Sequence, residues 1–100
     1  MFKHDLVISQ HAFDSFKEII EEVQKSSLIA AERLRHKLLH RLHHIQHHPM
    51  ESSRKVEIPR EEGEIRCSNL MNYRIYYLVT SDKIILMEVV AEKQTSRSAV

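Results

Sequence analysis

The chain has 100 residues, of which 42% are hydrophobic and one is glycine. This length fits a single domain over residues 1–100, and the composition excludes a low-complexity or disordered chain. Its 15 Lys and Arg residues are nearly balanced by 14 Asp and Glu residues, giving a formal net charge of +1 with the eight histidines neutral. The overall charge therefore does not indicate nucleic-acid binding, and any such role must come from a local patch.

The sequence predicts a cytoplasmic protein with no membrane partner. Its single cysteine, Cys67, has no second cysteine with which to form an internal disulfide, which fits a reducing compartment. No apolar run approaches the roughly 20 residues of a membrane-spanning helix, and the N-terminus lacks the apolar core of a signal peptide. Cys67 falls in a predicted strand, and we expect it to be a buried small side chain rather than a nucleophile.

The first half of the chain predicts a short strand and then a helix. The apolar run 6–8 fits one buried strand, and Ser9 is placed to cap a helix ending near Lys25. Along this helix the apolar residues recur at three- and four-residue spacing: Ala12, Phe13, Phe16, Ile19, Ile20 and Val23.

A second helix follows after a very short break. Ser26 and Ser27 interrupt the pattern, and either serine can cap a helix that starts near Leu28 and ends before Pro49. So short a connection predicts an antiparallel helical hairpin. One stripe of this second helix is apolar at 3.6-residue periodicity: Ala31, Leu34, Leu38, Leu42 and Ile45.

The second half predicts an antiparallel meander. Residues 55–58 alternate within a polar stretch and fit a short edge strand. Residues 65–70, 73–80 and 83–92 are rich in β-branched and aromatic residues and are separated by two short turns, 71–72 and 81–82. The expected fold class is α+β: an N-terminal strand, a two-helix hairpin, and a three- to four-stranded antiparallel meander with the helices on one face.

Strand alternation assigns the side chains of the last two strands to faces. Those expected to face the helices are Ile75, Tyr77 and Val79, together with Ile85, Met87, Val89 and Ala91. Those expected on the opposite face are Arg74, Tyr76 and Leu78, next to Glu88. The polar tail 94–100 is expected to fray.

The order of these elements resembles the RelE/ParE toxin superfamily of type II toxin–antitoxin systems, which includes plasmid stabilisation proteins. The resemblance covers nearly the whole chain. It is carried by Ser9 and Ala12 at the start of the first helix, and by Ile65-Arg66 and the apolar strand 84–90. The second helix adds the pattern Ala31, Leu34, Ile45 and Pro49, and the strand Tyr73-Arg74-Ile75-Tyr76-Tyr77 resembles the family's Tyr-Arg strand.

The resemblance implies a toxin neutralised by a cognate antitoxin, and oligomers are expected to form through that antitoxin. RelE-like members cleave mRNA on the ribosome, whereas ParE-like members inhibit DNA gyrase. The ParE-like function is favoured here because the segment after Val90 lacks the basic residues typical of the nucleases. The alternatives are a RelE-like ribosome-dependent mRNA endoribonuclease and a detoxified relative that only binds antitoxin.

If the chain is a nuclease, the resemblance assigns Arg74 to the scissile phosphate and Lys93 to the basic position after the last strand. Arg66 and Lys55 are expected to converge with them on the open sheet face, where guanidinium groups suit phosphate. Tyr76 shares this face and is a candidate for stacking or target contact. The alternative is that these are solvated strand residues paired with carboxylates, since no residue is identified as a general base.

Histidines form a second candidate feature on the second helix. His36, His40, His43 and His47 fall about 140° to 200° from the apolar stripe, which predicts an exposed ridge. Histidines four residues apart can chelate a transition metal, and the ridge also suits a pH-dependent partner surface or a dimer contact. No further ligand is placed by the sequence, so we expect a solvated ridge, with no metal site and no cofactor.

Overall fold

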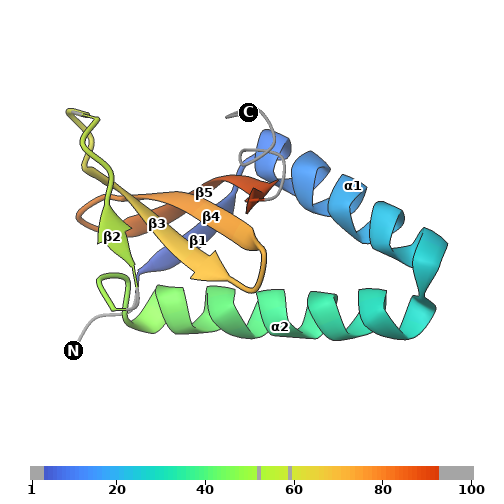
Figure 1. Cartoon of the computed structure of the whole chain (residues 1–100). Coiled ribbons are helices and arrows are strands. Elements are labelled where there is room, and N and C mark those ends of the chain that lie inside the picture. The colour runs from blue at the N-terminus through green and yellow to red at the C-terminus, as the bar shows by residue number, and fades with distance from the viewer. Residues whose placement is uncertain (1–3, 52, 59, 93–100) are drawn as a thin grey trace.

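The computed structural model describes residues 4–51, 53–58 and 60–92 (Figure 1). Its elements, in chain order, are β1 (Asp5–Ile8), α1 (Gln10–Ser26), α2 (Leu28–His47), β2 (Arg54–Lys55), β3 (Glu64–Leu70), β4 (Tyr73–Val79) and β5 (Lys83–Ala91). This order confirms the predicted α+β fold class, and the meander has four strands. The edge strand predicted at 55–58 is shorter and begins one residue earlier, since β2 spans Arg54–Lys55, although the Val56 amide still donates to the Ile65 carbonyl of β3 at 2.8 Å.

The two helices are joined by one residue, Ser27, which has extended backbone angles. Each helix is capped by a serine side chain. Ser9 Oγ accepts a hydrogen bond from the Ala12 amide at 3.0 Å, and Ser27 Oγ accepts one from the Ala30 amide at 3.0 Å. Of the two serines that the sequence left open as the second cap, Ser27 is therefore the one used.

The five strands form a mixed sheet in the order β1-β5-β4-β3-β2. β1 pairs in parallel with β5, and all other neighbouring strands are antiparallel. β1 ends opposite Leu86, and the first two turns of α1 continue beside β5, where Ser15 Oγ accepts a hydrogen bond from the Val89 amide at 3.3 Å. The Val89 amide lies beyond the end of β1, and α1 therefore supplies its hydrogen-bond acceptor.

Both helices pack on one face of the sheet. The apolar stripe predicted on α2 is buried throughout, and Ala12 is the fully buried residue of α1. Tyr77 and Ile75, which the alternation placed on this face, are also fully buried. The main core cluster comprises Ala12, Leu38, Leu42, Ile45, Ile75, Tyr77, Val79, Ile84, Leu86 and Val89.

The faces predicted for β5 are wrong over its first half. Ile84 and Leu86 face the helices and are buried, whereas Ile85 and Met87 are only partly buried. The cause is an irregularity in register: Tyr76 lies opposite Glu88, but Tyr77 lies opposite Leu86. Met87 is therefore an additional residue, and such a bulge reverses the alternation on either side of it. Val89 keeps its predicted face because it follows the bulge.

None of the helices within the described part of the chain is long and apolar enough to cross a membrane. Cys67 is buried on β3, as predicted. The predicted frayed tail, 94–100, lies outside the described residues.

Candidate functional site

Arg74 lies on the sheet face opposite the helices, between Asn69 of β3 and Val90 of β5. Its Nη2 donates to Glu92 Oε2 at 3.3 Å. Tyr76 lies on the same face, directly opposite Glu88 of β5, as predicted. Glu88 in turn lies 3.4 Å from His11 Nε2 of α1. The face therefore carries the carboxylates of Glu88 and Glu92 beside Arg74 rather than presenting a purely positive surface.

The surroundings of Arg74 favour its charged form. A hydrogen bond with the Tyr76 side chain, and then the Glu92 carboxylate, raise the pKa of the guanidinium above its ordinary value. Its Nε is buried and has no hydrogen-bond partner in the part of the chain that is described. Arg74 thus remains a cation held by a carboxylate, with one donor still unpaired.

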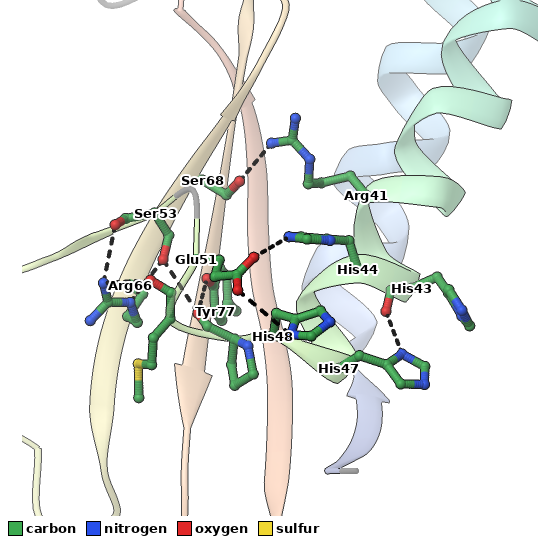
Figure 2. A network of polar contacts seen from close by, with 12 residues as sticks. Arg41, His43, His44, His47, His48, Glu51, Ser53, Arg66, Ser68 and Tyr77 are labelled. Carbon is green, nitrogen blue, oxygen red and sulfur yellow. Dashed lines mark hydrogen bonds and ion pairs between the residues drawn. The ribbon is translucent and has the colours of Figure 1, made fainter. Parts of the chain in front are cut away.

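Arg66 lies on the other face of the sheet. It stands opposite Tyr77, which faces the helices, whereas Arg74 precedes the helix-facing Ile75 by one residue. Alternation therefore places the two arginines on opposite faces. Arg66 Nε donates to Ser53 Oγ at 2.8 Å, and its Nη2 donates to the Ser53 carbonyl at 3.1 Å (Figure 2). Arg66 also pairs with Glu64.

The predicted convergence of cations on one open face is thus wrong for Arg66. Lys55 is paired with Arg66 across the strands, so both side chains lie on the helix side of the sheet, and that of Lys55 is exposed. Arg66 instead holds the loop after α2 against the sheet, together with the Tyr77 hydroxyl, which donates to the Pro49 carbonyl at 2.6 Å. Lys93 lies outside the described residues, so its role stays a prediction.

The histidine ridge predicted on α2 is present. His36, His40, His43 and His47 are all exposed, and the His43 and His47 rings lie 4.5 Å apart between centroids. At the end of the helix, His44 and His48 lie 3.6 and 3.8 Å from opposite oxygens of Glu51 (Figure 2). Among residues 4–51, 53–58 and 60–92, no group of three or more His, Cys, Asp or Glu residues is arranged to hold a metal ion.

Sequence reasoning missed a cationic hollow beside α2. It has a volume of about 370 Å³ and lies between the helix and the end of β3. Arg41 is fixed there, since its Nη1 donates to Ser68 Oγ at 2.7 Å and to the Asn69 carbonyl at 2.6 Å. The sequence signal for this hollow is the four-residue spacing of Lys37 and Arg41, which places both cations on one side of α2. The residues lining the hollow are Lys37, His40, Arg41, His44 and Leu70.

The fold and these surfaces define a class of small α+β protein in which a helical hairpin covers one face of a meander. The other face carries Arg74, Tyr76 and Glu88 at one end and buried apolar residues such as Leu78 at the other. The chain matches the family model of the ParE toxin of the type II toxin–antitoxin system parDE over residues 6–95. No curated protein matched the chain. Because the match extends from β1 past β5, the chain belongs to the ParE toxin family, and the resemblance to the RelE/ParE superfamily is confirmed. Membership of a toxin–antitoxin family implies a cognate antitoxin as partner.

Proposed function

We propose that this protein inhibits growth by binding DNA gyrase and that its cognate antitoxin neutralises it by covering the toxin. The observation that carries the proposal is the separation of the candidate phosphate-binding arginines, Arg66 and Arg74, onto opposite faces of the sheet. Cleavage of a phosphodiester requires positive charge gathered at one phosphate. Inhibition by binding has no such requirement, and the match to the ParE family supports the same target class.

A supercoiling assay tests this proposal. The purified full-length chain is added to DNA gyrase, ATP and relaxed plasmid, and the topoisomers are separated on a gel. We expect supercoiling to fall with increasing toxin and to recover when the antitoxin is added first. Full supercoiling at a large molar excess of folded toxin would contradict a gyrase target.

The second candidate function is ribosome-dependent mRNA cleavage, for which the resemblance implies that Arg74 binds the scissile phosphate. An Arg74→Ala variant separates the two mechanisms. Under the gyrase proposal, growth inhibition by R74A stays within about threefold of the wild type, because Arg74 serves no reaction. Loss of codon-phased mRNA cuts in R74A, with an unchanged melting temperature, would instead establish the nuclease. The matched control is Lys83→Ala, which removes an exposed cation at the start of β5.

A further inference from the structure

The cationic side of α2 carries basic residues with unneutralised charge. Arg33, Lys37 and Arg41 follow one another at four-residue intervals and share one side of the helix. None of the three has an ion pair with a carboxylate within the part of the chain that is described. Glu32 is the single acidic residue of α2, and it pairs with Arg35 and lies near His36 instead.

Arg41 is held in place by neutral acceptors. Figure 2 shows its side chain reaching from α2 to Ser68 on β3, and the Asn69 carbonyl accepts from the same Nη1 atom. These bonds fix the guanidinium without neutralising its charge, and they leave the Nη2 and Nε donors for a ligand. A fixed, charged fork of donors of this kind suits a phosphate group.

The hollow beside Arg41 has the composition of an anion site. Lys37 and Arg41 supply charge, and His40 and His44 supply ring nitrogens, although His44 also lies 3.6 Å from Glu51. Leu70 is the single apolar residue of the lining. A protein partner normally anchors apolar side chains in a pocket, whereas phosphate contacts need only charge and donors.

The cations also extend beyond the hollow. Four residues of α-helix advance about 6 Å along the axis, so the charges of Arg33, Lys37 and Arg41 span about 12 Å. A single phosphate group can contact only the cations beside the hollow, whereas a nucleic-acid backbone can contact all three, since each strand of a duplex carries one phosphate charge per ~3.4 Å of helix axis. The side chains of this face carry no Phe, Tyr or Trp, so base stacking is not expected to contribute.

From these observations we infer that the face of α2 formed by Arg33, Lys37 and Arg41, together with the hollow beside Arg41, binds the phosphate backbone of a nucleic acid without sequence preference. This inference goes beyond the proposed function and does not depend on gyrase as the target. It also explains how a chain with a net charge of +1 presents a nucleic-acid surface. Four of the compensating carboxylates lie on α1 (Asp14, Glu18, Glu21 and Glu22), whereas Glu51 lies beside the hollow next to His44 and Glu32 pairs with Arg35.

Fluorescence anisotropy of labelled nucleic acid tests the inference. The full-length chain is titrated into a 20-base-pair duplex DNA of arbitrary sequence and into an RNA hairpin of similar length, at about 50 to 200 mM salt. With three phosphate contacts, the slope of log K against log salt is expected to be about −2.7, so that binding weakens about 40-fold over this range. Scrambling the duplex sequence should leave the affinity within about twofold.

The decisive variant is Arg33→Gln with Lys37→Gln, since both side chains are exposed on the helix. The magnitude of the salt slope should decrease by about two units in this variant, because two phosphate contacts are lost. The matched control, Lys17→Gln with Lys25→Gln, removes two exposed cations from α1 and should keep the wild-type slope. Arg41→Gln, checked by thermal melting, is expected to lower the affinity further.

Three results would overturn the inference: no binding of DNA or RNA at about 50 mM salt, an R33Q/K37Q variant equal to the wild type, or equal losses in R33Q/K37Q and K17Q/K25Q. Binding of a poly-glutamate peptide without binding of either nucleic acid would likewise overturn it, and would assign the face to an acidic protein.

Discussion

Gly63 lies where the chain enters β3, and it packs against the backbone of β4 more closely than any other residue type allows. A Cβ atom built on Gly63 would lie 2.0 Å from the Val79 carbonyl oxygen. This atom belongs to the backbone of a paired strand, so it cannot move aside without disturbing the hydrogen bonds between β3 and β4.

Gly63→Ala is therefore expected to reduce the free energy of unfolding by about 1–3 kcal/mol through overpacking. Urea unfolding followed by circular dichroism measures this change. Glu61→Ala, at an exposed position two residues earlier, serves as the control and should stay within about 0.5 kcal/mol of the wild type. Equal free energies of unfolding for the two variants would mean that the close approach of Gly63 to Val79 does not limit the residue type at this position.

Tyr77 predicts a loss of stability at alkaline pH. It is fully buried, its hydroxyl donates to the Pro49 carbonyl, and burial raises the pKa of this hydroxyl above its ordinary value, against smaller lowering effects of Ser53 and Arg66. An unfolded tyrosine ionises near pH ~10, so above that pH the unfolded chain binds fewer protons than the folded chain. Stability contributed by Tyr77 is thus complete below pH ~10 and is lost as the pH rises toward the raised folded-state pKa.

The free energy of unfolding of the wild type and of Tyr77→Phe, measured from pH 8 to 11, checks this sign. Tyr77→Phe lowers stability at neutral pH by about 1 kcal/mol through loss of a hydrogen bond, and its stability should fall less steeply above pH ~10. Parallel curves for the two proteins would show that Tyr77 does not carry the dependence.

At the scale of elements, local patterns in the sequence predicted most of the fold. The α2 stripe and the serine caps depend on neighbours three or four residues apart, so they are visible without tertiary structure. The faces of β5 depend on the bulge at Met87, which depends on pairing with β4 across the chain. For the same reason the sequence could not place Arg66 and Arg74 on opposite faces, since strand register decides the face of each residue.

The helical hairpin exposes apolar side chains that a partner is expected to cover. Phe13 is 52% exposed and Leu39 is 48% exposed, and at the hairpin tip Leu28 and Ile29 are 71% and 72% exposed. Large apolar side chains exposed to this extent favour a protein-interaction surface on the hairpin. The proposed neutralisation predicts that the antitoxin buries some of them.

Phe13→Gln with Leu39→Gln is expected to weaken antitoxin binding by a factor on the order of 10 to 100, because buried aromatic and aliphatic anchors dominate interface energies. Isothermal titration calorimetry with the cognate antitoxin measures the affinity. Glu18→Gln with Gln24→Ala changes two exposed residues of α1 and should bind as the wild type does. Unchanged affinity of the apolar variant would place the antitoxin elsewhere.

At the scale of the whole molecule, charge is divided between the two helices. α1 carries four acidic residues and two lysines, whereas α2 carries three arginines, one lysine and one glutamate. The net charge near zero is therefore the sum that includes a negatively charged α1 and a positively charged α2. A sum over the sequence could not predict the cationic face, because the helical positions of the charges decide which of them gather.

The most direct test of the central claim is controlled expression of the full-length chain in cells that lack its antitoxin. Plasmid topology and mRNA integrity are measured from the same culture within minutes of induction. The account predicts that growth stops, plasmids lose negative supercoiling and mRNA stays intact. Codon-phased mRNA cleavage with normal supercoiling, or unimpeded growth at full expression of folded protein, would contradict it.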